Sequence, residues 1–132
     1  MGNTLPKTPK QNELILPILK FIKKVIRHDT RKSILDKSLG ESGNLSITAL
    51  VNVLDSSDAW KKFMCLIEKE DITSMQTDLP REDFKLISIR MCDIGELRVF
   101  AQLWESVKMC YSNASDIDML KIRKADEIML CG

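Results

Sequence analysis

The sequence predicts an all-α fold: one compact single-domain bundle of about five to seven short helices, preceded by a flexible N-terminal arm. Of the 132 residues, 44% are hydrophobic and only 5% aromatic, and Leu, Ile and Met dominate. Such unbranched side chains lose little freedom in a helix. Gly and Pro are scarce, at five and four residues, which leaves few turn signals. Apolar residues recur at helical spacing along most of the chain, and neither strand-like alternation nor an internal repeat is found.

Residues 1–12 are predicted to form the flexible arm, and residues 13–132 the single helical domain. Pro6 and Pro9 block a helix in the arm, whose other residues are mostly polar. Gly2 follows Met1, as the N-myristoylation pattern M-G-x-x-x-[ST] requires, whereas Pro6 stands where that pattern has Ser or Thr. Gly2 is therefore a candidate lipidation site. The alternative is a glycine that only permits removal of Met1.

The first helix, from about Glu13 to Arg27, is the most strongly patterned segment. Its apolar residues recur at helical spacing on one face: Ile15, Ile18, Leu19, Ile22, Val25 and Ile26. Its cations gather on a separate arc and continue just beyond the helix: Lys20, Lys23, Lys24, Arg27, Arg31 and Lys32. These six residues are the candidate membrane- or anion-binding site. Leu16 lies at the rim of the cationic arc, where a core would not need it.

Two shorter helices should follow. A second helix over residues 31–39 is expected to end at Gly40, a residue suited to the turn after a helix. Residues 41–44 then form a turn. Ser46 is expected to cap a third helix that extends to about Leu54.

Polar residues cap a fourth helix: Ser56, Ser57 and Asp58. Its apolar residues again recur at helical spacing: Trp60, Phe63, Met64 and Ile67. Residues 71–80 are predicted to be a loop, and Pro80 suits the first position of a fifth helix. A kink or break is expected at residues 93–95, and a sixth helix then extends to about Tyr111. Residues 112–115 break that helix, and a last helix covers residues 116–130.

The charge is distributed unevenly. Residues 1–32 contain eight basic and two acidic residues, a net charge of +6, whereas the whole chain is only +1. No global field therefore attracts nucleic acid or lipid, and any attraction must come from the first quarter of the chain. The absence of a signal peptide and of an apolar run of about 18 residues predicts a cytoplasmic protein.

No catalytic or metal-binding motif is present. Cys65, Cys92 and Cys110 lie in apolar helical patterns, as reduced core thiols would, and no C-x-x-C pair occurs. His28, the only histidine, is expected to cap or complement the end of the basic helix, because adjacent residues such as His28 and Asp29 do not face each other on a helix. We therefore expect a non-enzymatic protein with no catalytic residue, no metal, no cofactor and no small-molecule substrate.

The layout of the chain resembles a retroviral Gag matrix domain. Gly2 at the N-terminus, a short arm, a basic first helix and a helical domain of this length carry the resemblance. It implies a myristoylated domain of five or six helices that takes a polyprotein to the inner leaflet of the plasma membrane and oligomerises there.

A second segment, Ser46 to Glu70, is similar to the opening of a regulator-of-G-protein-signalling box. The matching residues are Leu50, Ala59, Trp60, Phe63 and Glu70. The segment that follows in that family is replaced here by DITSMQTDLPREDF, so the G-protein contact is not implied.

Three functions follow from these patterns. The preferred one is a matrix-like or adaptor protein that docks on the cytoplasmic face of an anionic membrane, including the inner face of the plasma membrane, through lipid head groups. The second is a helical module that binds another protein or itself. The third, nucleic-acid binding, is disfavoured because few aromatic residues accompany the cations and no recognition motif is present.

Overall fold

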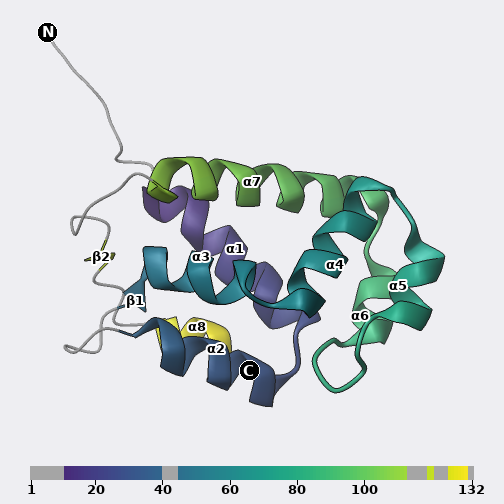
Figure 1. Ribbon diagram of the computed structural model, residues 1–132, viewed down its shortest axis with the longest axis horizontal. Helices are drawn as coiled ribbons and strands as arrows, with labels where there is room; N and C mark the ends of the chain where they lie inside the picture. The colour runs from purple at the N-terminus through teal and green to yellow at the C-terminus, as the bar shows by residue number, and fades with distance from the viewer. Residues whose placement is uncertain (1–10, 40–44, 113–118, 121–124, 131–132) are drawn as a thin grey trace, which may run out of the picture.

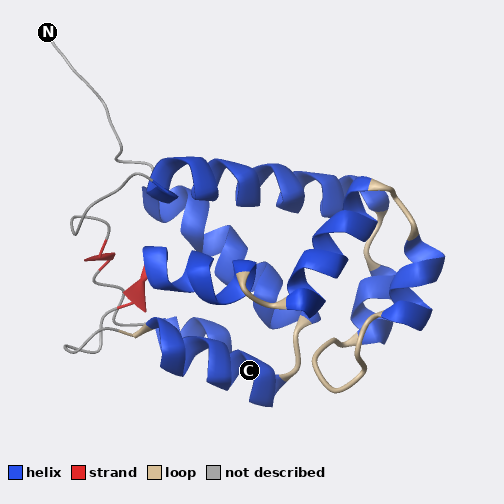
Figure 2. Cartoon of the chain, in the orientation of Figure 1, coloured by secondary structure: helices blue, strands red, loops and turns tan. Residues whose placement is uncertain are grey.

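In the computed structural model, residues 11–39, 45–112, 119–120 and 125–130 are described. Helices account for 80% of them, which confirms the all-α prediction. Eight helices and two short strands occur in these ranges: α1 Gln11–Val25, α2 His28–Ser38, β1 Leu45–Ser46, α3 Ile47–Asp55, α4 Asp58–Glu68, α5 Ile72–Asp78, α6 Leu86–Met91, α7 Ile94–Ser112, β2 Met119–Leu120 and α8 Ala125–Leu130 (Figures 1 and 2). The predicted arm and Gly2 lie outside the described residues.

Helix α1 lies at the centre of the packing. It contacts α7, α8, α6 and α2, while α3 and α4 cover the remaining side of the core (Figure 1). The apolar face predicted for this helix is buried, because Ile15, Ile18, Leu19, Ile22 and Val25 are all 0% exposed. Leu16 also packs partly against the core, contrary to expectation, because neighbouring helices cover a wider arc of α1 than its main apolar face.

An aromatic cluster joins α1, α4 and α7. Phe21 stacks on Phe100 with ring centroids 4.0 Å apart. Trp60 meets Trp104 edge to face at 5.3 Å, in the geometry that aromatic pairs favour. Phe63 extends the cluster to Phe84 at 5.1 Å, which ties the segment before α6 to the core.

The N-termini of α3 and α4 form as the sequence predicts. The Ser46 hydroxyl accepts a hydrogen bond from the amide of Ala49 at 3.2 Å. The Ser57 hydroxyl likewise accepts one from the amide of Trp60 at 3.2 Å. Each bond satisfies a donor that a helix N-terminus otherwise leaves free.

Residues 71–80 are not a loop. Asp71 caps α5 by accepting a hydrogen bond from the amide of Ser74 at 3.0 Å, and the helix buries Met75. The prediction was wrong because one buried residue in seven leaves almost no periodic signal. Pro80 does not begin the next helix either. The chain instead pairs with the end of α1, and α6 starts only at Leu86.

Two short strands also form, and β2 replaces part of the predicted last helix. Leu45 pairs antiparallel with Leu120, and Ser46 with Met119. Residues 119–120 were predicted to be helical, and this prediction was wrong because a two-residue strand is too short to show alternation. The helix in this region begins at Ala125.

Candidate anion-binding surface

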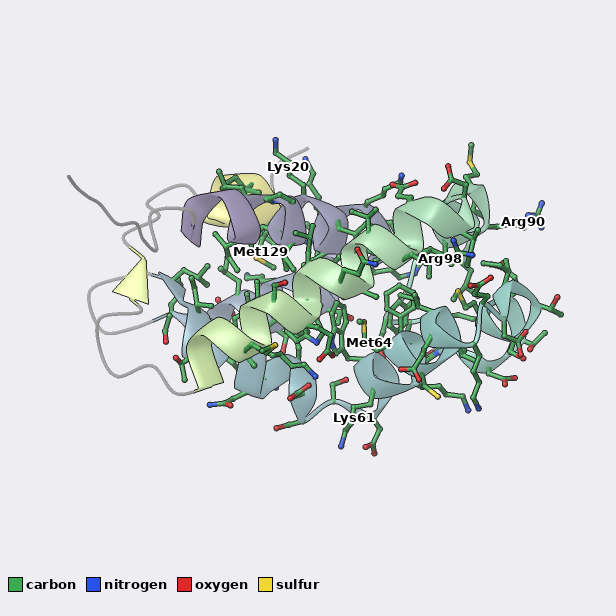
Figure 3. All side chains as sticks on the ribbon, turned by 90° about the horizontal axis from the view of Figure 1, so that it is seen from above. Lys20, Lys61, Met64, Arg90, Arg98 and Met129 are labelled. Carbon is green, nitrogen blue, oxygen red and sulfur yellow. The ribbon has the colours of Figure 1, made fainter. Side chains whose placement is uncertain are left out.

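Burial of one face of α1 leaves its cations on the opposite face. Lys20 and Lys24 are exposed and Lys23 is half-buried. Lys20 projects away from the body of the protein, on the side opposite Lys61 of α4 (Figure 3). No described side chain forms an ion pair with Lys20 or Lys23. The helix thus presents part of the predicted cationic arc to solvent.

The C-terminal end of α1 is held by a segment far away in the sequence. The amide of Arg27 donates to the carbonyl of Asp83 at 2.8 Å, and the amide of Lys85 donates to the carbonyl of Val25 at 2.7 Å. The Lys85 ammonium also donates to the carbonyl of Lys23 at 3.1 Å. A cation at the C-terminal end of a helix donates hydrogen bonds to the free carbonyls there and interacts favourably with the helix dipole.

Lys85 therefore joins the cations of α1. Burial lowers the pKa of the Lys85 ammonium, and the charges of Arg31, Lys23 and Arg27 lower it further. That mutual repulsion identifies a local excess of positive charge. Helical periodicity did not reveal Lys85, because only the pairing with the end of α1 brings it to this face.

Arg31, predicted as a surface contact, is instead 5% exposed. Its Nη1 donates to the carbonyl of Met129 at 2.7 Å in the last turn of α8, and to the carbonyl of Lys23 at 3.4 Å. Burial lowers the pKa of the guanidinium, and its Nε has no hydrogen-bond partner among the described residues. Arg31 thus fastens α8 to the end of α1 and does not face solvent.

A signal for this burial was present in the sequence. The buried residues of α2 recur at i, i+3, i+4 and i+7: Arg31, Ile34, Leu35 and Ser38. A helical face that contains Arg31 together with Ile34 and Leu35 places the arginine toward the core.

The other predicted cations have different surroundings. The Lys24 ammonium lies 2.5 Å from the carboxylate of Glu96, and this hydrogen bond is the main reason that the pKa of Lys24 is raised. The Arg27 Nε donates to the carbonyl of Arg81 at 2.8 Å while its side chain stays exposed. Lys32 is exposed on α2. We define the basic surface as Lys20, Lys23, Arg27 and Lys85.

The surroundings of His28 differ from the prediction. His28 is the first residue of α2, where the helix dipole disfavours a cation, so its predicted role at the end of the basic helix was wrong. Its Nδ1 lies 3.5 Å from the carboxylate of Asp29, and both side chains are exposed. Within the described ranges, no group of three His, Cys, Asp or Glu side chains is placed to hold a metal ion.

Two hollows are present among the described residues. A cavity of about 500 Å³ between α2, α3 and α4 is lined by Ile34, Leu54, Trp60 and Phe84. A groove of about 790 Å³ between α4 and α7 is lined by residues that include Met64. No helix in the described part of the chain is long and apolar enough to cross a membrane.

The cysteines divide into two environments. Cys92 is buried, as predicted, and its Sγ donates to the carbonyl of Ser88 at 3.3 Å. Cys65 is exposed, contrary to prediction, because it lies on the solvent side of α4. The side chains of Cys110 and Cys131 lie outside the described residues.

Comparison with protein-family models, with curated proteins and with solved structures finds no match to this chain. The resemblance to a matrix domain and the similarity to a regulator-of-G-protein-signalling box stay predictions.

Proposed function

We propose that this chain is a non-enzymatic adaptor that docks on the cytoplasmic face of an anionic membrane through the basic surface. The observation that carries the proposal is the pairing of the end of α1 with the segment before α6, which brings the Lys85 ammonium to the carbonyl of Lys23 and joins the amide of Arg27 to the carbonyl of Asp83. The ammonium and guanidinium groups of the basic surface suit the phosphate and carboxylate groups of lipid heads.

The strength of such docking can be estimated. Each cation near an anionic surface contributes about 1 kcal/mol. The four residues of the basic surface therefore contribute about 4 kcal/mol, which corresponds to a dissociation constant of roughly 1 mM. Charge alone holds the protein only weakly, so the proposal requires a second contribution. Acylation of Gly2 would supply one, because one acyl chain and one basic surface together give stable anchoring.

Cosedimentation with phosphatidylcholine vesicles, with and without phosphatidylserine, tests the proposal. Reversing three cations (Lys20→Glu, Lys23→Glu and Arg27→Glu) should abolish binding to the anionic vesicles. Arg31 is left unchanged because it is buried.

The matched control reverses three exposed cations of α4 and its C-terminal cap: Lys61→Glu, Lys62→Glu and Lys69→Glu. It changes the net charge equally, and one of its residues, Lys61, lies on the side opposite Lys20 (Figure 3). Binding that survives in the first variant, or that disappears equally in both, would reject the basic surface as the docking site. Mass spectrometry of the N-terminal peptide after expression in a eukaryotic host tests acylation separately.

A helical interaction module is the second candidate, favoured by the groove between α4 and α7. Met64 and Ala101 are among the apolar residues that line this groove, and grooves between helices accept amphipathic helices. Self-association through the groove would produce a dimer in sedimentation velocity that Met64→Glu removes. A monomer at all concentrations would exclude self-association.

A further inference from the structure

Helix α6 presents an uncovered apolar pair to solvent. Ile87 is 75% exposed and Met91 is 80% exposed. They lie four residues apart, so their side chains share one face of the helix. On the opposite face Ile89 is 0% exposed, which fixes α6 to the core and directs the pair outward.

Helix α6 lies beside one end of the basic surface. Lys85 immediately precedes α6, and its ammonium contacts the carbonyl of Lys23 in α1. Helix α6 itself packs against α1. Arg90 is exposed on α6 and projects from the end of the molecule (Figure 3). Arg90 is thus an exposed cation on the helix that carries the pair, and Lys85 links the start of this helix to α1.

Asp83 before α6 accepts a hydrogen bond from the Thr30 hydroxyl at 2.8 Å, whereas Glu82 is exposed, and the two acidic groups that follow α6 are engaged within the protein. The Asp93 carboxylate accepts a hydrogen bond from the amide of Glu96 at 2.7 Å, at the start of α7. The Glu96 carboxylate pairs with Lys24. The exposed residues of α6 are thus the apolar pair and one cation beside it, Arg90.

We propose that α6 is a membrane-insertion element, in which Ile87 and Met91 enter the boundary between head groups and acyl chains. The proposal rests on the proposed function and supplies the second contribution that docking by charge requires. An anionic bilayer offers negative charge at its surface and an apolar layer beneath, in the order that this surface needs. A second copy of the chain would instead bring the same cations against one another.

Vesicle binding of a double variant, Ile87→Ser with Met91→Ser, tests the insertion. We expect affinity for phosphatidylserine vesicles to fall about tenfold, with loss of the binding that persists at about 0.5 M salt, where surface charge is screened. The matched control, Val99→Ser with Met109→Ser, removes two exposed apolar residues of α7 and should bind as the wild type does.

The depth to which α6 enters the bilayer is measured with a Met91→Trp variant and lipids brominated on their acyl chains. The native Trp60 and Trp104 are each 1% exposed, so the introduced indole reports contact with lipid. We expect bromine to quench it, and not to quench the indole of a Met109→Trp control. An unquenched indole, or a double serine variant that binds like wild type, would refute the insertion. Ile87 and Met91 would then be assigned to contact with a protein partner. If the serine variant binds normally while charge reversal abolishes binding, only the insertion fails.

Discussion

Replacing Arg31 with methionine separates a role in folding from a role in membrane contact. The variant removes the hydrogen bond from Nη1 to the carbonyl of Met129, at 2.7 Å. A bond from a charged donor contributes about 1.5–3 kcal/mol. The carbonyl of Lys23 keeps the Lys85 ammonium as a donor, so little is lost there.

Part of that loss is offset. The guanidinium is 5% exposed and its Nε has no described partner, so its removal relieves a desolvation cost. Methionine is similar in length and retains most of the packing. We therefore expect the free energy of unfolding to fall by about 1–2 kcal/mol, with the largest increase in amide exchange in α8.

Urea unfolding followed by tryptophan fluorescence measures this change, because Trp60 and Trp104 are both in the core. Lys32→Met is the matched control: it removes the same charge from the adjacent, exposed residue and should change stability by less than about 0.5 kcal/mol. Vesicle binding by Arg31→Met should stay within about twofold of wild type, since a buried group does not contact lipid. An unchanged urea midpoint together with weakened vesicle binding would refute the assignment of Arg31 to the fold.

Three further predictions follow from local geometry. Ser57→Ala removes the cap of α4 and should lower the free energy of unfolding by about 1 kcal/mol, whereas the exposed Ser106→Ala should not; equal urea midpoints would contradict the cap. Burial raises the pKa of the Cys92 thiol while Cys65 is exposed, so iodoacetamide should modify Cys65 first, and mass spectrometry showing the reverse order would disprove this. The amide and hydroxyl of Ser74 lower the pKa of Asp71 below 3.8, so the stabilisation by its carboxylate is present at neutral pH and is lost as the pH falls through the folded-state pKa. The stability difference between wild type and Asp71→Asn should therefore shrink below about pH 4, and a difference independent of pH would count against it.

The sequence predicted those helices in which buried apolar residues recur at helical spacing over several turns. Helix α1 is the strongest example, because five of its apolar positions are completely buried. The caps at Ser46 and Ser57 were also predictable, since a hydroxyl before a helix has a local role. Helix α5 was missed because its seven residues include only one buried side chain, Met75.

The candidate site was only partly predictable, because it depends on contacts between distant segments. The helical spacing of residues in α1 predicted that Lys20 and Lys23 lie on a face separate from its apolar residues. Lys85 could not, since it reaches this face only through backbone pairing of residues 25–27 with residues 83–85. Arg31 was assigned to the surface because it continued the positive charge of α1, although the chain leaves α1 at Val25 and begins a new helical period.

The central claim is that the basic surface binds anionic membranes, and the most direct test is the ratio of vesicle affinities of the two charge-reversal variants. Loss of about three cations, each contributing about 1 kcal/mol, predicts that the Lys20, Lys23 and Arg27 variant binds phosphatidylserine vesicles roughly 100-fold more weakly than the α4 variant. Circular dichroism should show both to be folded. Equal affinities for the two folded variants would contradict the claim.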